Sequence, residues 1–206
     1  MIFRDLNLEQ NLIENLESLG YKTLTPIQEN SLKYSLEKKD IIARAKTGSG
    51  KTLAFCLPII NNLDKKKYRV QSLILAPTRE LATQIATTLR EVLRSTPNIK
   101  VLTLCGGVPY RPQVVSLEHK AHIIVGTAGR VLKHINEGNL KLEDINTFVL
   151  DEADKMLDMG FFDDISNVCS LLPKQRQTLL FSATFSNEIK NLALEFLNNP
   201  VNIEVE

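Results

Sequence analysis

Short apolar runs recur along the chain, and longer stretches with helical periodicity separate them. Most of these runs are continuously apolar, which is typical of strands buried on both faces of a parallel sheet. The runs predict strands at residues 40–45, 72–76, 101–104, 122–126, 147–150, 178–182 and 202–205. Because helical stretches lie between them, the repeated strand–helix unit predicts an α/β fold, with a doubly wound, mainly parallel sheet flanked by helices. The strand at 40–45 is expected near the centre of this sheet.

Two helices are predicted in the N-terminal region. Asn7 is the expected N-cap of the first helix, with Gln10 as its capping-box partner, and Gly20 is expected to end it in a left-handed conformation. Thr25 is the expected N-cap of the second helix, with Pro26 at its first position. The buried face of the first helix is marked by a stripe of leucines at helical spacing, namely Leu8, Leu12, Leu16 and Leu19.

The composition is that of an ordinary globular domain. The chain has 206 residues, of which 43% are hydrophobic and 24% charged, enough for one α/β domain with a real core. The sequence shows neither an apolar run of membrane-spanning length nor the apolar segment of a secretory signal, so we expect a cytoplasmic protein. The three cysteines are widely spaced among apolar neighbours, which predicts buried, reduced thiols at Cys56, Cys105 and Cys169.

The charge pattern gives no sign of nucleic-acid binding. The formal net charge is +1, and the basic run at 64–69 is interpreted as a solvated loop rather than an RNA-facing patch. The histidines lack metal-ligand spacing and are predicted to be unpaired and without a chemical role: His119, His122 and His134. Any chemistry must therefore be inferred from motifs.

A phosphate-binding loop follows the first predicted strand. Its residues are Ala45, Lys46, Thr47, Gly48, Ser49, Gly50, Lys51 and Thr52, and helix-forming residues come next. Gly48 and Gly50 allow the backbone N–H groups to turn inward onto phosphate oxygens at a helix N-terminus. Lys51 is expected to reach the β- and γ-phosphates and Thr52 to ligate Mg²⁺. Because Lys51 is expected to contact phosphate alone, its removal should leave the fold intact.

Acidic residues follow the predicted strand at 147–150. Asp151 stands at the strand end, where it could hold Mg²⁺, and Glu152 beside it could orient and deprotonate an attacking water. Together with a phosphate loop about 100 residues upstream, this pair predicts a nucleotide-hydrolysing site in which Lys51, Asp151 and Glu152 are catalytic. Ser182 and Thr184 end the next apolar strand, and their hydroxyls could bond to the acidic loop.

These motifs together resemble the N-terminal RecA-like domain of the DEAD-box RNA helicases, and the resemblance covers essentially the whole chain. The stretch Gly20-Tyr21 with Thr25-Pro26-Ile27-Gln28 resembles the family's Q motif. The resemblance implies that Gln28 reads the adenine edge and that Phe3 and Tyr21 pack around the base. It also implies a RecA-like P-loop fold, with a Q-motif region at 1–30 and the ATP-binding domain at 31–206.

The same resemblance implies an RNA-binding surface built from motifs at strand ends. Its residues are Pro77, Thr78, Arg79, Gly106, Gly107, Thr127, Gly129 and Arg130. Helix N-termini and arginines suit phosphate contacts, which carry no sequence information. Ala128 stands where the family usually has proline, so a looser turn is expected before Arg130. By resemblance, Asp154, Ser182 and Thr184 couple hydrolysis to strand separation.

The function implied is ATP-dependent RNA unwinding or remodelling with Mg²⁺. Some segments are most similar to the bacterial DbpA type and the chain end to the RhlE type. The DbpA type implies ribosomal RNA as target and ribosome assembly as the process. The working enzyme is expected to be a monomer with a second RecA-like domain that this chain lacks. Two other classes stay open: a P-loop translocase acting on DNA, and a non-catalytic RNA-binding scaffold that has kept the nucleotide pocket.

Overall fold

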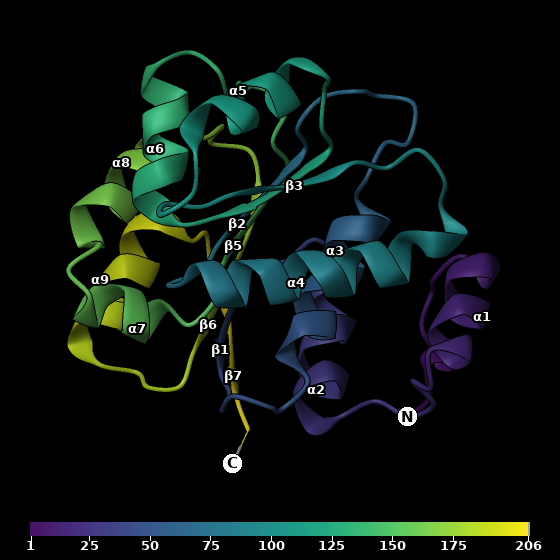
Figure 1. Ribbon diagram of the computed structural model, residues 1–206. Helices are drawn as coiled ribbons and strands as arrows, with labels where there is room; N and C mark the ends of the chain where they lie inside the picture. The colour runs from purple at the N-terminus through teal and green to yellow at the C-terminus, as the bar shows by residue number, and fades with distance from the viewer. Residues whose placement is uncertain (206) are drawn as a thin grey trace.

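The described residues 1–205 of the computed structural model contain a seven-stranded sheet (Figure 1). The strands are β1 (Ile41–Arg44), β2 (Ser72–Leu75), β3 (Val101–Leu104), β4 (Ile123–Gly126), β5 (Thr147–Leu150), β6 (Gln177–Ser182) and β7 (Val201–Glu204). They pair in the order β3-β4-β2-β5-β6-β1-β7, and all pairs are parallel. The predicted strands and the doubly wound α/β class are confirmed.

The expected place of β1 was wrong. β1 lies between β6 and the edge strand β7, and β5 occupies the centre of the sheet. Ile41, Ile42 and Ala43 are nonetheless buried, because helices cover both faces at this position and β7 covers the side. A continuously apolar run therefore indicates burial and does not distinguish a central strand from its neighbours.

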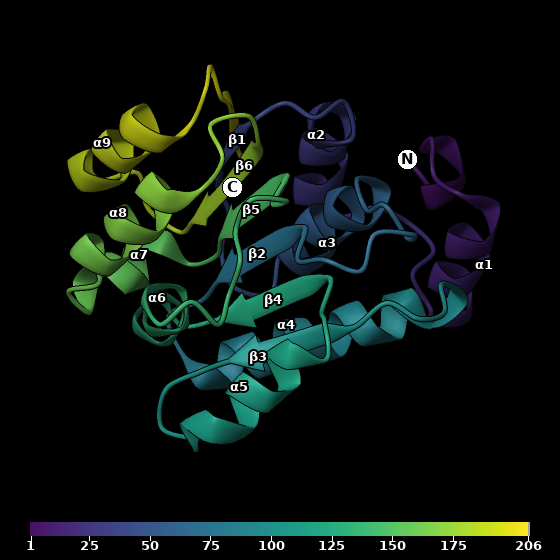
Figure 2. The same ribbon diagram turned by 90° about the horizontal axis from the view of Figure 1, so that it is seen from above.

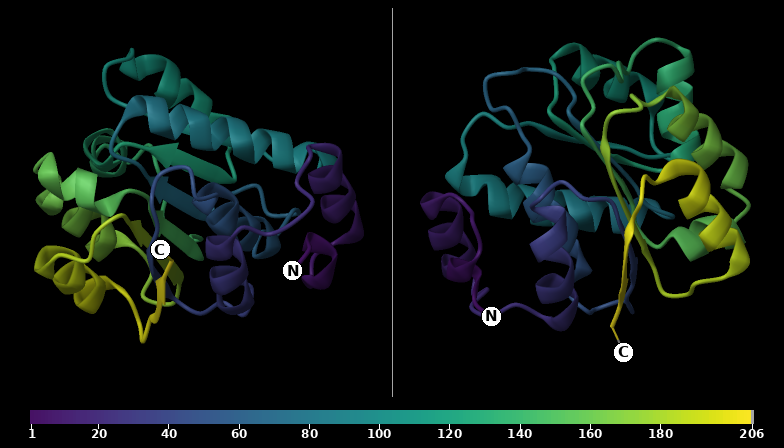
Figure 3. Two further views of the ribbon diagram at one scale, coloured as in Figure 1. Left: turned by 90° about the horizontal axis from the view of Figure 1, so that it is seen from below. Right: turned by 180° about the vertical axis from the view of Figure 1, so that it is seen from behind.

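Helices cover both faces of the sheet, as Figures 2 and 3 show. They are α1 (Gln10–Ser18), α2 (Pro26–Ser35), α3 (Lys51–Asn61), α4 (Arg79–Val92), α5 (Tyr110–Glu118), α6 (Ala128–Asn136), α7 (Ala153–Asp158), α8 (Phe162–Leu171) and α9 (Asn187–Phe196), with short 3₁₀ turns η1 (Phe3–Asp5) and η2 (Leu93–Ser95). Alternate strand residues enter different cores: Ile41 packs with the layer of α1 to α4, and Ile42 with the layer of α6 to α9. This alternation explains why the strands are apolar throughout.

The first helix begins later than predicted. Its N-cap is Glu9 rather than Asn7, because η1 and an extended segment occupy the preceding residues. The predicted capping-box role of Gln10 was wrong as well, because Gln10 is the first residue of α1 and its side chain donates to Glu14 Oε1 at 2.9 Å. Two other signals are confirmed: Gly20 is left-handed at φ 91°, and the extended Thr25 precedes Pro26 at the start of α2. Within α1, Asn15 donates to the main-chain carbonyls of Glu91 and Val92 at 3.0 and 2.8 Å. The Q-motif region is thereby fixed to the C-terminal end of α4.

Several minor expectations can be checked in the same structure. The three cysteines are free and buried, as predicted. The prediction that the histidines are unpaired was wrong for all three: His122 accepts a hydrogen bond from the Lys100 N–H, His134 bonds to Gln113, and a ring nitrogen of His119 lies 2.8 Å from the Val115 carbonyl oxygen. In the basic run, Lys65 pairs with Glu9, and Lys67 and Arg69 pair with Asp144, which favours the structural interpretation of this loop. Among residues 1–205, no helix is both long and apolar enough to span a bilayer.

Gly126 ends β4 at a close approach of two segments. A Cβ placed there would overlap the Leu104 carbonyl oxygen and lie 2.6 Å from Val131 Cγ2. We predict that Gly126→Ala lowers the free energy of unfolding by about 2–3 kcal/mol, because backbone must shift to accommodate the methyl group. Urea denaturation provides the measurement. Gly106→Ala is the matched control, since a Cβ at that position would have no heavy atom within 4 Å, and a similar loss in both variants would contradict the prediction.

Candidate nucleotide-binding site

The loop after β1 has the backbone shape that phosphate binding requires. Gly48 and Gly50 adopt left-handed conformations at φ 84° and 89°, and α3 begins directly afterwards at Lys51. Gly50 also needs the absence of a side chain, because a Cβ there would lie 2.8 Å from Gln28 Nε2 and 2.9 Å from Thr25 Oγ1. The glycine thus serves both the curl of the loop and its contact with the Q-motif region.

A cleft of about 390 Å³ opens beside this loop. The P-loop, the end of β5, the Q-motif region and α4 all contribute to its walls. The lining residues are Tyr21, Gln28, Thr47, Gly48, Gly50, Lys51, Thr52, Leu53, Leu81, Gln84, Thr88, Asp151 and Glu152. Most of the predicted nucleotide-contacting residues are therefore brought together.

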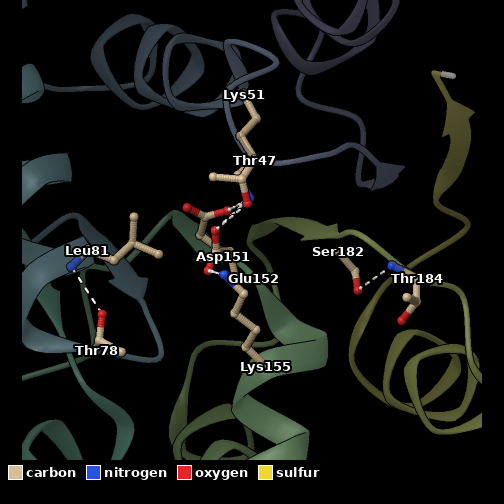
Figure 4. A network of polar contacts seen from close by, with 9 residues as sticks. All are labelled: Thr47, Lys51, Thr78, Leu81, Asp151, Glu152, Lys155, Ser182 and Thr184. Carbon is tan, nitrogen blue, oxygen red and sulfur yellow. Dashed lines mark hydrogen bonds and ion pairs between the residues drawn. The ribbon is translucent and has the colours of Figure 1, made fainter.

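Lys51 contacts more than the sequence suggested. Its ammonium group lies 3.2 Å from Asp151 Oδ1 and 3.4 Å from Glu152 Oε1, and the residue is 5% exposed (Figure 4). The expectation that Lys51 contacts phosphate alone was therefore wrong. The fold brings the P-loop and the end of β5 together across β6, and the buried carboxylates there require a nearby cation.

Glu152 is held by three groups. Thr47 Oγ1 donates to its Oε1 at 3.2 Å, Lys51 contacts the same oxygen, and Lys155 Nζ lies 2.7 Å from Oε2. Burial raises the pKa of Glu152, but the hydrogen bond from Lys155 and the charge of Lys51 outweigh it, so this pKa is lowered. Glu152 also adopts a left-handed conformation at φ 52°, an unusual one for this residue type. The carboxylate is thus kept ionised and aimed into the cleft.

Asp151 has the features of a cation ligand. Burial raises its pKa, and the charge of Lys51 acts in the opposite direction. Apart from the ion pair, neither carboxylate oxygen has a hydrogen-bond partner within the described chain. A cluster of three or more metal-ligating side chains is not found among residues 1–205. This donor set fits Mg²⁺, which protein sites usually bind through one or two carboxylates together with waters and substrate phosphates.

Gln28 is buried between the Q-motif region and the P-loop. Its Oε1 accepts a hydrogen bond from the Thr25 N–H, and its Nε2 donates to the Gly50 carbonyl oxygen, both at 2.9 Å. Tyr21 lines the cleft, whereas Phe3 is 1% exposed and packs edge-on against Tyr21 at 6.5 Å between ring centroids. In this structure Phe3 supports Tyr21 from the core side.

The remaining predicted residues of the P-loop and the coupling motif lie around the cleft. Ala45 is buried and donates its N–H to the Ser182 carbonyl oxygen, while Lys46 lies in a separate hollow beside Arg44. Ser182 Oγ accepts from the Thr184 N–H at 3.4 Å rather than from the acidic loop. The Asp154 Oδ1 atom is buried without a hydrogen-bond partner in the described part of the chain.

The residues predicted to bind RNA converge at the carboxyl ends of β2, β3 and β4. Arg79 donates to the Gly107 carbonyl oxygen at 3.5 Å, and the Gly106 N–H donates to Thr127 Oγ1 at 3.2 Å. Arg130 donates to the Val108 carbonyl oxygen at 3.1 Å. Within the same set Thr78 caps α4, Pro77 is buried, and Gly129 lies in the first turn of α6.

Ala128 occupies the first position of α6 and is fully buried. Proline is well accepted at this position, because its missing N–H would be unsatisfied there in any case. The preceding Thr127 has an extended backbone, which a following proline also favours. The backbone at this turn therefore has the form that a proline would impose.

Sequence reasoning missed three groups of residues at or near the site. Gln113 is buried, and its Oε1 accepts from Arg130 at 3.1 Å and contacts His134 Nε2 at 2.8 Å. Lys155 of α7 contacts Glu152, the residue just before this helix. The two residues are three positions apart, a spacing from which the sequence could have suggested the contact. Residues on one face of α4 line the cleft, namely Leu81, Gln84 and Thr88, and their helical spacing gave a usable signal.

Comparison with known proteins agrees with this geometry. The DEAD/DEAH box helicase family matches residues 25–192. The chain is 48% identical over 194 residues to the ATP-dependent RNA helicase DbpA of Escherichia coli, covering 94% of this chain and 42% of that protein. It is 44% identical over 204 residues to the DEAD-box ATP-dependent RNA helicase CshA of Geobacillus kaustophilus, covering 99% of this chain and 44% of that protein.

A solved structure is also similar. The crystal structure of a DEAD box protein from Methanococcus jannaschii superposes with a TM-score of 0.94 at 38% identity, covering 100% of this chain and 56% of that one. The chain belongs to the DEAD/DEAH box helicase family, and its fold is that of a RecA-like domain of this family. Within the family, the similarity to the DbpA type is confirmed, and CshA helicases are also close. The chain spans less than half the length of these two relatives.

The contacts of Lys51 generate a prediction about stability. Lys51→Ala should lower the free energy of unfolding by about 3 kcal/mol in the absence of nucleotide, because the buried carboxylate of Asp151 loses its cation. The double variant Lys51→Ala/Asp151→Asn should recover most of this loss, because Asp151 is the carboxylate left without a cation, whereas Glu152 keeps its contact with Lys155. Urea denaturation of the four proteins of this cycle measures the coupling. Additive effects of the two substitutions would show that the ion pair contributes nothing.

Proposed function

We propose that this chain is the nucleotide-binding half of an ATP-dependent RNA helicase. The observation that carries the proposal is the single cleft where the P-loop, Asp151, Glu152 and Gln28 meet. The names of the relatives, ATP-dependent RNA helicases, support the same activity. The expected RNA-contacting loops lie at the same carboxyl edge of the sheet, which is where open α/β sheets bind their ligands.

The residues of the cleft suit hydrolysis of the γ-phosphate. The inward N–H groups of the loop and the N-terminus of α3 would hold the phosphates, and Lys51 would leave the carboxylates to offset phosphate charge. Glu152, ionised and pointed into the cleft, would position and deprotonate the attacking water. Thr52 and Asp151 would hold Mg²⁺, which neutralises developing phosphate charge when bound.

The finer parts of the proposal follow from the family resemblance. We infer that the working enzyme contains a second RecA-like domain, which is supported by relatives more than twice as long as the matched segment. Ribosomal RNA as target, action in ribosome assembly, a cytoplasmic location and a monomeric enzyme are proposals supported by the similarity to DbpA. Arg79 and Arg130 lie in the first turns of α4 and α6, and helix N-termini together with arginines suit an RNA phosphate backbone.

The 206-residue chain alone should bind Mg-ADP weakly and displace no RNA strand. In P-loop NTPases an arginine finger from another domain or protein raises turnover about 10³–10⁵-fold. Two RecA-like domains are also needed to close around the RNA. Strand displacement from a short RNA duplex at saturating Mg-ATP is the measurement. Displacement above the no-enzyme rate would contradict the two-domain proposal. In a two-domain enzyme, stimulation of ATPase activity by DNA but not RNA would favour the translocase alternative, and no hydrolysis at all would favour the scaffold.

Gln28→Ala should erase the preference for ADP over GDP. Phosphate contacts are common to both nucleotides, so selection between them must come from groups that face the base, and an amide can pair with the adenine edge. Isothermal titration with both nucleotides measures the ratio of affinities. Asn30→Ala is the matched control: Asn30 is a half-buried amide of the same helix that lies outside the cleft lining, and its side chain donates to the Pro26 carbonyl oxygen. A variant that retains the wild-type ratio would assign base selection to another residue.

A further inference from the structure

We propose that Gln84 and Thr88 of α4 bind the ribose hydroxyl groups of the nucleotide, which makes α4 a second wall of the site. This inference rests on the proposed nucleotide-binding function and extends it to residues outside the P-loop, the Q motif and the acidic loop. The observation behind it is that both side chains line the same cleft as Gln28 and Lys51.

The spacing of the residues on α4 places them on one face. Leu81, Gln84 and Thr88 are separated by three and four residues, so their side chains follow one another along a single helical stripe. Ala82, Ile85 and Leu89 form another face of the same helix, which is buried in the core. The stripe that lines the cleft is therefore held in place by a packed helix rather than by a mobile loop.

Two ends of the cleft differ in chemistry. The phosphate end is formed by polar residues of the P-loop and of the segment directly after β5, namely Thr47, Lys51, Thr52, Asp151 and Glu152. The other polar side chains of the lining come from the Q-motif region and from α4: Tyr21, Gln28, Gln84 and Thr88. A nucleoside attached to phosphates at the first end would meet this second group.

Gln28 has limited capacity left for a nucleoside. A glutamine amide offers two N–H donors and an oxygen with two lone pairs. One lone pair accepts from Thr25 and one N–H donates to Gly50. The remaining N–H and lone pair suffice for the two bonds of an adenine edge, and leave nothing for the sugar. The ribose hydroxyls therefore need other partners.

Gln84 and Thr88 have groups available for them. Across residues 1–205, the Gln84 side chain makes no hydrogen bond. The Thr88 hydroxyl donates to the Gln84 carbonyl oxygen at 3.2 Å and keeps its lone pairs. An amide and a hydroxyl together can both donate to and accept from a pair of vicinal hydroxyls. Gln84 and Thr88 are therefore better suited to the sugar than to the face of the base. The aromatic ring of Tyr21 suits the face of the base better.

The test is a titration of the intact chain with Mg-ADP, 2′-deoxy-ADP and 3′-deoxy-ADP, followed by NMR or calorimetry. Gln84→Ala and Thr88→Ala should each weaken Mg-ADP binding about two- to tenfold, the usual range for one neutral hydrogen bond. They should also reduce the discrimination against at least one deoxy nucleotide. Thr88→Ser, which keeps the hydroxyl, should restore wild-type affinity.

Thr87→Ala provides a matched control. Thr87 is the neighbouring residue on α4 and its hydroxyl also donates one turn back, to the Thr83 carbonyl at 3.0 Å, but it lies outside the described cleft lining. Both threonine-to-alanine changes favour the helix slightly, so thermal melting should show intact folds. Thr87→Ala should bind all three nucleotides like the unaltered chain.

The outcomes separate the inference from the proposed function. If Gln84→Ala and Thr88→Ala bind Mg-ADP with unchanged affinity and unchanged deoxy discrimination, the ribose contact is wrong while the nucleotide site stands. An equal loss in Thr87→Ala and Thr88→Ala would also overturn it, because a general effect on α4 would then be responsible. If the unaltered chain binds no adenine nucleotide, both the inference and the proposed function fail.

Discussion

The ammonium group of Lys51 joins two parts of the chain that lie about 100 residues apart. It reaches from the first turn of α3 to the carboxylates of Asp151 and Glu152 beyond β5, with β6 between the two strands. Buried carboxylates without a cation would be costly, so the contact stabilises the ligand-free site in one arrangement. In the proposed nucleotide site the same lysine would meet phosphate, and its contact with the carboxylates would then be exchanged.

The surroundings of this contact are arranged so that exchange is possible. Glu152 has further partners in Thr47 and Lys155, and would remain neutralised after Lys51 moved away. Asp151 has no such further partner among the described residues, so its carboxylate would require another cation if Lys51 moved away. The Gly50 carbonyl oxygen of the loop accepts a hydrogen bond from Gln28. A shift of the loop backbone would therefore act on the Q-motif region through this bond. These features explain how a site can be well packed without ligand and still be suited to one.

Much of the fold could be predicted from the sequence because it follows from local patterns. Continuous apolar runs gave the strands, and Gly20, Thr25 and Pro26 marked helix ends through their own backbone preferences. The P-loop and the acidic pair were recognisable because each is contiguous in sequence. The place of β1 in the sheet could not be predicted in this way, since pairing depends on strands far along the chain.

The site's supporting contacts were harder to predict for a similar reason. The partners of Lys51 and the bond between His134 and Gln113 join residues that are distant in sequence. Asn7 failed as an N-cap because an extended segment follows η1 and delays the start of α1 until after Glu9. Lys155 and the lining face of α4 were accessible to periodicity arguments. They were overlooked because periodicity shows which residues share a helix face, but not what that face contacts.

The mounting of α4 has a mechanical consequence. Its first residue, Arg79, donates to the Gly107 carbonyl oxygen, and its last turn accepts hydrogen bonds from Asn15. At about 1.5 Å per residue the helix forms a strut of roughly 21 Å with both ends pinned. A strut of fixed length cannot yield at its middle without moving an end. A ligand in the cleft that displaces α4 would therefore also displace Arg79. A polyanion bound to Arg79 would oppose the same displacement. Each ligand would then change the affinity for the other by the same factor.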